Sequence, residues 1–193
     1  FFVEAKKPAV SVKADAGPGC FSAIGDPTEG ALLVAAARSG MFQDRLQAAA
    51  PRVAEAPFDS NRKRMTTVHR LADGDGVPDA LLPFKGSEQV AFTKGAADGL
   101  LARATRVWTG ERPEPLTAAL QAQIRAAGDG LAQAGMRVLG VACRLLEAPT
   151  ASADADLIER DLTFLGLIGL MDPPRAAVKP AVDTCKAAGI RPV

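Results

Sequence analysis

The chain has 193 residues, of which 48% are hydrophobic, and its 23 Lys and Arg residues are nearly balanced by 22 Asp and Glu residues. A length of this order fits one domain, or one domain followed by part of a second. The composition is typical of a globular protein and argues against wholesale disorder. A net charge of +1 gives no electrostatic bias toward nucleic acid or an anionic membrane surface, so neither is expected as a partner.

Three further features bear on cellular context. The longest apolar run, Leu162 to Met171, has ten residues, against the roughly 20 that span a bilayer, so no direct membrane contact is expected. The start of the chain shows no signal-peptide pattern and no initiator Met, which indicates a piece of something longer. Cys20, Cys143 and Cys185 form no CxxC pair, so neither a disulfide framework nor a zinc site is predicted.

Helix signals occur in five segments of the chain. The first segment has Asp26 or Thr28 as a cap, Pro27 early, Glu29 in the first turn and Gly40 as a stop, which together predict a well-defined helix. The predicted helices therefore lead from this cap to residue 40 and cover residues 42–50, 96–104, 117–134 and 176–188.

Strands are predicted from β-branched alternation or from apolar runs, at residues 65–71, 90–94, 136–143 and 162–171. The last of these is apolar enough to be central in a sheet. An Asp-Gly repeat at residues 73–76 predicts a turn between antiparallel strands. Loops are expected around Pro113 and Pro115 and over residues 148–156. Hairpin-joined strands with inserted helices predict an α+β fold on a mainly antiparallel β-sheet flanked by helices.

The double proline at residues 173–174 is the best candidate for a domain boundary. We expect residues 1–171 to form one domain. Residues 172–193 are expected to form a hinge and the beginning of a different, βα-type unit, in which residues 189–193 start another strand.

Common phosphate-binding and catalytic patterns are missing from the sequence. It has no GxxxxGK[ST] loop and no GxGxxG fingerprint. The single histidine, His69, has no accompanying partner motif, so we expect a solvent-facing strand residue rather than a catalytic one.

Two local features could serve an anionic ligand that carries a flat ring. Phe58 stands beside the cationic run Arg62-Lys63-Arg64, which would combine stacking with charge-assisted contacts. On spacing alone, a solvated turn with Phe58 in the core is the favoured alternative. In the second feature, Lys94 ends a strand and Gly95 precedes a helix start, where a ligand could approach the backbone.

Five motifs occur in a fixed order, at residues 25–32, 58–65, 94–96, 135–140 and 172–175. This ordered set, which covers nearly the whole chain, resembles the nucleotide-binding (N) domain of P-type cation-transporting ATPases. The chain contains no His-Pro dipeptide, which argues against the heavy-metal branch of that family. The pattern looks most like the type II pumps, which include calcium and sodium–potassium transporters.

The resemblance implies a site that grips ATP by its adenine. Phe58 would stack on the adenine ring, and Glu29 would lie at the adenine edge near the exocyclic amine. Leu139 would give apolar contact to the base, and Met65 would line the same pocket.

The resemblance also assigns residues to the phosphate side of the nucleotide. Lys63 and Lys94 would line the pocket toward ring and phosphates, and Arg137 would reach a phosphate. Gly95 and Ala96 would allow close approach. Many members carry Pro-Glu after Lys-Gly-Ala, whereas this chain has Ala97-Asp98; the charge is kept and the backbone restraint of the proline is lost.

Residues 172–175 would match the hinge to the phosphorylation domain, and the phosphate-accepting Asp-Lys-Thr-Gly-Thr stretch of that domain is not in this sequence. The expectation is thus a cytoplasmic, ATP-binding domain of an integral membrane pump. Its partners would be ATP and the phosphorylation and actuator domains of the same chain, with Mg²⁺ used by the full-length pump. Such a piece would bind ATP without hydrolysing it. The alternative is an interaction module whose loop at residues 62–64 docks an acidic protein surface without binding nucleotide.

Overall fold

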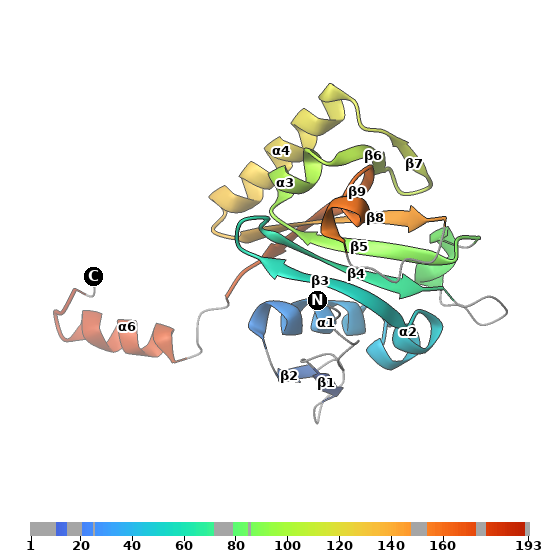
Figure 1. Ribbon diagram of the computed structural model, residues 1–193. Coiled ribbons are helices and arrows are strands. Elements are labelled where there is room, and N and C mark those ends of the chain that lie inside the picture. The colour runs from blue at the N-terminus through green and yellow to red at the C-terminus, as the bar shows by residue number, and fades with distance from the viewer. Residues whose placement is uncertain are drawn as a thin grey trace.

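The computed structural model describes residues 11–14, 21–24, 26–71, 79–84, 86–147, 154–172 and 177–191. Its centre is a seven-stranded sheet with helices on both faces (Figure 1). In spatial order the strands are β3 (Arg52–Asp59), β4 (Arg64–Arg70), β5 (Gln89–Gly95), β8 (Arg137–Leu146), β9 (Leu162–Leu170), β6 (Ala104–Trp108) and β7 (Pro113–Pro115). A separate pair is formed by β1 (Ser11–Ala14) and β2 (Phe21–Ile24).

Neighbouring strands of the large sheet run antiparallel, except that β6 and β9 pair in parallel. The helices are α1 (Pro27–Arg38), α2 (Gln43–Ala49), α3 (Ala97–Leu101), α4 (Ala118–Gln133), α5 (Ala155–Ile158) and α6 (Val178–Ala187), with a 3₁₀ helix η1 (Asp79–Phe84). This arrangement confirms the predicted α+β class and the mainly antiparallel sheet.

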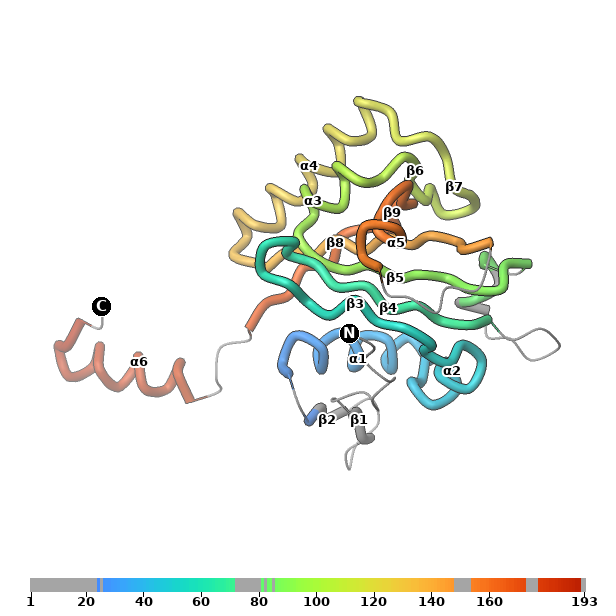
Figure 2. The backbone as a smooth tube through the Cα atoms, viewed as in Figure 1, coloured from blue at the N-terminus to red at the C-terminus, as the bar shows by residue number. Residues whose placement is uncertain are grey.

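The helices divide between the two faces of the sheet. Figures 1 and 2 show α1 and α2 on one face and α3 and α4 on the other. The strand alternation follows this division, because neighbouring side chains of a strand point to opposite faces. On β5, Val90 is buried in the cluster that includes Ala50 of the α2 side, whereas Ala91 is buried in the cluster that includes Ile158 of α5.

The core consists of three clusters of buried side chains. Under α3 and α4 lie Leu100, Leu101, Val107, Ala142, Leu162 and Phe164. Beside α5 lie Ala54, Ala56, Val68, Ala91, Leu146 and Ile158. On the opposite face lie Ala50, Leu81, Phe84, Val90 and Cys143.

Most of the predicted elements are confirmed by the structure. Helices α1, α2, α4 and α6, and strands β4, β5, β8 and β9, lie within a few residues of the predicted ranges. Strand β9 has partners on both sides, as its apolar sequence predicted. The turn at residues 73–76, Cys20 and the boundary at residues 173–174 fall outside the described residues.

The structure corrects several expectations. Strand β3, before the cationic run, was not predicted, and the helix predicted over residues 96–104 ends at Leu101, with strand β6 beginning at Ala104. Pro113 and Pro115 lie in β7, at the edge of the sheet, where a missing N–H costs no ladder hydrogen bond. Part of the loop predicted over residues 148–156 belongs to α5, and residues 189–191 form no strand.

Helix α6 lies away from the sheet in both ribbon and tube views (Figures 1 and 2). The division of the chain at the double proline stays a prediction.

Candidate functional site

Strands β4, β5 and β8 present several of the predicted site residues on the same face of the sheet. Met65 pairs directly with Lys94, and Lys94 pairs directly with Val141, so these three side chains share a face. Because side chains alternate along a strand, Leu139 and Arg137 belong to that face as well. The four predicted residues Met65, Lys94, Leu139 and Arg137 are therefore brought together by sheet register.

The start of α1 lies against this face and adds two further residues. The carboxylate of Glu29 accepts a hydrogen bond from the Lys94 ammonium and forms an ion pair with it. The Arg137 guanidinium donates to the Thr28 hydroxyl at 3.3 Å. The side chains of Lys94 and Glu29 remain 23% and 38% exposed, so the pair stands at the surface where a ligand could reach it.

The sequence of the α1 start explains why Glu29 is held there. Asp26 caps the helix, and its carboxylate oxygen Oδ1 accepts the backbone N–H groups of Thr28 and Glu29 at 2.9 and 3.0 Å. The hydrogen bond from Glu29 is the main cause that lowers the pKa of the Asp26 carboxyl below its usual value of 3.8. Glu29 thus lies in the first helical turn, where the N–H groups and the helix dipole favour a negative charge.

The β3–β4 turn, which here means residues 58–64 and includes the ends of both strands, carries two more predicted residues. Phe58 exposes 63% of its surface, so the alternative that placed this ring in the core is wrong. The carboxylate of Asp59 accepts the N–H groups of Asn61 and Arg62 at 2.9 and 2.8 Å, and hydrogen bonding from Arg62 lowers its pKa. Lys63 closes the turn in the left-handed region, with φ of 52°, and its side chain is exposed.

Gly95 and Ala96 lie against this turn. The Ala96 N–H donates to the Lys63 carbonyl at 3.0 Å. A Cβ atom on residue 95 would lie only 2.4 Å from that same carbonyl oxygen, which no ordinary contact allows. The close approach that Gly95 permits is therefore that of two backbone segments, the turn and the end of β5.

Beneath the turn, on the α5 side of the sheet, lies a buried carboxylate that the sequence analysis missed. Glu159 is fully buried and accepts hydrogen bonds from Arg62 at 2.5 Å, Arg64 at 2.6 Å and Thr66 at 2.9 Å. Burial alone would raise the pKa of Glu159, but these three hydrogen bonds outweigh it and hold the pKa below its usual value. Nothing in the local sequence around Glu159 indicated such partners.

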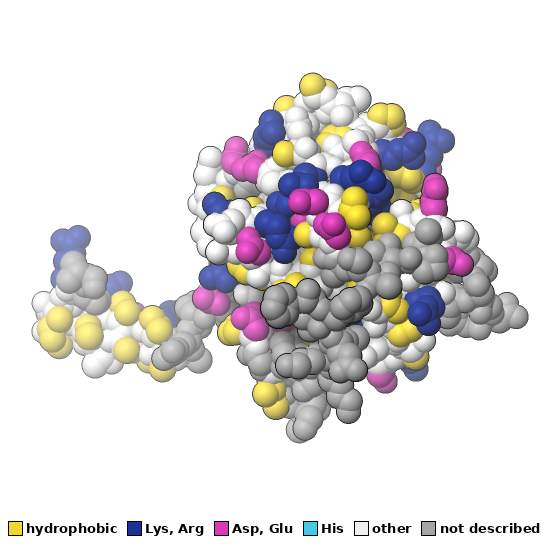
Figure 3. Space-filling view, viewed as in Figure 1, with side chains coloured by type: hydrophobic (Ala, Val, Ile, Leu, Met, Phe, Trp, Pro, Cys, Tyr) yellow, Lys and Arg dark blue, Asp and Glu magenta, His cyan; other side chains and the backbone are white. Residues whose placement is uncertain are grey.

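This network shows that the cationic run at residues 62–64 is not a free, solvated loop. Arg64 is 6% exposed and Arg62 is partly buried, and both bind Glu159, so Lys63 is the most exposed of the three. In the space-filling view basic and acidic side chains are interspersed on the face shown (Figure 3).

Two other residues considered from sequence lie elsewhere. Asp98 faces Arg125 of α4 at 3.8 Å, on the α3–α4 side of the sheet, away from Lys94. His69 is partly buried rather than solvent-facing: its Nδ1 donates to the Ala50 carbonyl and its Nε2 accepts from Thr67, both at 2.9 Å. Burial lowers its pKa, which is consistent with a neutral structural residue.

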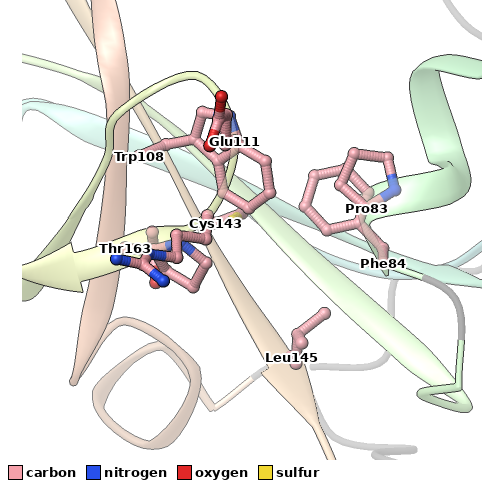
Figure 4. Close-up of a pocket in the computed structure, with 9 residues that line it drawn as sticks. Pro83, Phe84, Trp108, Glu111, Cys143, Leu145 and Thr163 are labelled. Atoms are coloured by element: carbon pink, nitrogen blue, oxygen red, sulfur yellow. The ribbon is translucent and has the colours of Figure 1, made fainter.

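A pocket of about 440 Å³ lies near the C-terminal end of β8, away from Arg137. Its lining includes none of the predicted site residues. Figure 4 shows Trp108 and Glu111 on one side of it and Pro83 and Phe84 on the other, with Cys143 between them. Burial raises the pKa of the Cys143 thiol to about 12, so this thiol stays protonated near neutral pH.

In the described part of the chain, no helix is both long enough and apolar enough to cross a membrane. Nor do the described residues bring together three or more His, Cys, Asp or Glu side chains in a way that could hold a metal ion.

Comparison with known proteins gives one consistent result. The family model described as "P-type ATPase, cytoplasmic domain N" matches residues 8–177. The calcium-transporting ATPase 1 of Bacillus cereus is 39% identical over 172 residues, which cover 89% of this chain and 18% of that protein.

Two further relatives show the same partial overlap. The calcium-transporting ATPase of Bacillus subtilis is 34% identical over 169 residues, covering 88% of this chain and 17% of its own. The cation-transporting ATPase pma1 of Synechocystis is 35% identical over 170 residues, covering 88% and 17%. The chain thus spans less than a fifth of the length of these relatives.

Proposed function

The chain belongs to the family of P-type ATPase cytoplasmic N domains, and from this premise we propose that it binds ATP at the site formed by α1, β4, β5, β8 and the β3–β4 turn. The observation that carries the proposal is the grouping of Glu29 and Lys94 on one open face, next to Met65 and Leu139. A carboxylate, an ammonium group and apolar side chains are the contacts that an adenine nucleotide needs.

In the proposed complex the adenine stacks on the exposed ring of Phe58, and Leu139 and Met65 contact the base. Glu29 accepts a hydrogen bond from the exocyclic amine of the adenine. Lys63 and Lys94 lie toward the ring and the phosphates, and Arg137 reaches a phosphate. Gly95 and Ala96 serve the site by letting the turn lie directly against the end of β5, as their contacts with Lys63 indicate.

For the parent protein, we propose a cation-transporting ATPase that spans the membrane and uses ATP and Mg²⁺. The names of the relatives, which are calcium-transporting and cation-transporting ATPases, support this. This chain would supply the nucleotide, and a phosphorylation domain and an actuator domain would complete the reaction. Since the described residues offer no cluster of metal ligands, we assign no Mg²⁺ ligand to them.

The competing function, an interaction module that docks an acidic surface, depends on a free cationic loop. Two of the three charges of that loop bind Glu159 and are at least three-quarters buried, with side-chain exposures of 24% for Arg62 and 7% for Arg64. The exposed charge that remains, Lys63, makes a weak docking surface by itself.

A competition experiment tests the proposed function. We expect ATP, ADP and AMP to compete for one site in isothermal titration calorimetry, and GTP to compete more weakly. The reason is that guanine has a carbonyl acceptor where adenine has an amine, which would leave the Glu29 carboxylate facing another acceptor. Glu29→Gln should narrow the difference in affinity between ATP and GTP, because an amide can both accept and donate hydrogen bonds.

The outcomes separate the two functions. Equal competition by GTP would show that Glu29 does not contact the adenine edge. Binding of an acidic peptide, with no binding of any nucleotide, would favour the interaction module and contradict the proposal.

A further inference from the structure

We propose that Glu159 is a positioning residue for the nucleotide: it holds the β3–β4 turn, residues 58–64, in the conformation that presents Phe58 and Lys63. This inference rests on the proposed function of the site. Glu159 lies 97 residues from Arg62 and 95 from Arg64 along the chain, yet it binds both. The carboxylate is fully buried and accepts hydrogen bonds from several residues, unlike the carboxylate of a surface ion pair.

Each carboxylate oxygen of Glu159 has its own partners. Oε1 accepts from Arg62 Nη1 at 2.5 Å and from the Thr66 hydroxyl at 2.9 Å, and Oε2 accepts from Arg64 Nε at 2.6 Å. Thr66 in turn shares a hydrogen bond of 2.9 Å with Thr93 on β5. The direct partners of the carboxylate therefore come from β4 and the turn, and Thr66 links the network to β5, so its position is fixed by several contacts.

Arg62 transmits this anchoring to the aromatic end of the turn. Its second guanidinium nitrogen, Nη2, donates to the Pro57 carbonyl at 2.7 Å, directly before Phe58 in the chain. Arg64 acts on the other side, where its Nη1 donates to the Arg62 carbonyl at 2.9 Å. Glu159 thereby restrains the backbone on both sides of the turn.

Glu159 cannot itself touch a nucleotide bound beside Lys94. Thr66 and Thr93, which lie next to it, pair directly across β4 and β5 and share the α5 face of the sheet. Met65 and Lys94 pair at the neighbouring position and point to the opposite face. The anchor and the candidate nucleotide site are therefore separated by the sheet, and any effect of Glu159 on binding must pass through the turn.

A positioning role and a purely structural role of Glu159 lead to different nucleotide affinities of the folded variants. Without the carboxylate, Arg62 can turn into solvent and the Pro57 carbonyl loses its donor. Phe58 and Lys63 then occupy the binding position for a smaller fraction of the time, and the apparent affinity falls by that fraction. A purely structural residue would lower the melting temperature and leave the affinity of the folded protein unchanged.

The test compares nucleotide affinity and thermal unfolding of matched variants by calorimetry, well below the melting temperatures. We expect Glu159→Gln to weaken ATP and AMP alike, by about 10-fold, since the aromatic part of the site is disturbed. The control is Val107→Ala, which truncates a buried side chain on β6, separated from β4 by β5, β8 and β9, and should lower the melting temperature while binding ATP like the parent. Arg62→Gln, at the more exposed end of the network, should repeat the loss if Glu159→Gln fails to fold.

A double variant makes the test sharper. Because both residues act through one contact, Glu159→Gln combined with Arg62→Gln should bind ATP no more weakly than the weaker single variant. Folded Glu159→Gln that binds ATP within two-fold of the parent (about the error of such a comparison), or additive losses in the double variant, would overturn the positioning role. If the parent protein itself binds no nucleotide, the proposed function fails instead, so the two failures are distinguishable.

Discussion

Phenylalanine is usually buried, and the 63% exposure of Phe58 is unusual for a ring within a β-strand. The ring is not needed to fill the core, since its neighbours in β3 that do so are the alanines Ala54 and Ala56. An exposed ring in a segment that also carries the exposed Lys63 suits a stacking platform for a base. At the scale of single residues, Phe58 is thus the side chain with which to measure the base-binding part of the site.

We expect Phe58→Ala to weaken ATP and AMP to the same degree, at low and at high salt. Stacking is worth about 1–3 kcal/mol per base on other aromatic platforms, or roughly a 5- to 150-fold change in affinity. The matched control is Phe42→Ala, which removes another exposed ring, 42% exposed, that lies beyond the far end of α1. Titration calorimetry of both variants gives the comparison, with thermal unfolding to establish that each is folded. A folded Phe58→Ala that binds like the parent would remove the aromatic platform from the site.

Arg137 tests the phosphate side of the site. Its guanidinium donates to the Thr28 hydroxyl at 3.3 Å, and no carboxylate among the described residues forms an ion pair with it. Arg137→Ala should weaken ATP more than AMP, by about 1.5- to 5-fold, and the loss should shrink as salt is added. Arg106→Ala, which removes an exposed arginine on β6, serves as the control for a change in total charge. An equal loss for AMP and ATP would place Arg137 at the base instead of the phosphates.

At the scale of elements, the strongly patterned helices and strands could be predicted from the sequence, and the irregular ones could not. The capped start of α1 and the apolar run of β9 each carry their own signal. Strand β3 does not, because Pro57 and a polar turn interrupt its pattern, and its pairing with β4 contains register shifts. Strand β7 is hidden by Pro113 and Pro115, since prolines fit only an edge strand, and which strand is at the edge is decided by the whole fold.

The same distinction holds for the site. Motif order located Glu29, Phe58 and Lys94, and the structure brings Glu29 and Lys94 into an ion pair. The role of Glu159 could not be predicted, because its partners are supplied by tertiary contacts with residues far away in sequence. For the same reason the sequence suggested a free cationic run where the structure shows two arginines already bound.

The N-cap of α1 links an element to the site, because it fixes the turn that carries Glu29. We expect Asp26→Ala to lower the melting temperature and to weaken ATP, since the N–H groups of Thr28 and Glu29 lose their acceptor. Asp26→Asn keeps a side-chain acceptor and should fall between the parent and the alanine variant. Circular dichroism during heating, together with titration of ATP, measures both effects.

The pH dependence of this cap has a defined sign. The pKa of Asp26 is lowered in the folded protein, so the unfolded chain binds more protons and the stabilisation is present above the usual value of 3.8. It is lost as the pH falls through the lowered pKa. The difference in melting temperature between parent and Asp26→Ala should accordingly be constant near neutral pH and shrink below about pH 4. A difference that grows on acidification would contradict the capping role of the carboxylate.

At the scale of the whole molecule, the sheet separates the candidate nucleotide site from the buried network that holds the turn. One face and the β3–β4 turn carry the candidate nucleotide site, and the opposite face carries the cluster under α3 and α4 and the Glu159 network. Helix α6 stands apart from both (Figure 1).

This chain is expected to bind ATP without turning it over. Phosphoryl transfer depends on positioning and on metal-assisted neutralisation of charge, and the Asp-Lys-Thr-Gly-Thr stretch that the family uses as acceptor is not in this sequence. Incubation of the purified chain with ATP and Mg²⁺ should release phosphate no faster than buffer. Saturable release that depends on protein and survives repurification would contradict this expectation; the Phe58→Ala variant is the control that links any release to the site.

The pairing of Arg62 with Glu159 has a consequence for how the protein is made. During synthesis the β3–β4 turn leaves the ribosome long before the residue that anchors it. Strands β5 and β8 extend the sheet from β4, but β6 joins it only through β9, which begins three residues after Glu159 and lies between β8 and β6. Domains fold as units once their long-range contacts can form. We therefore expect the proposed nucleotide site to form late, only after Glu159 has been synthesised and β9 has joined the sheet.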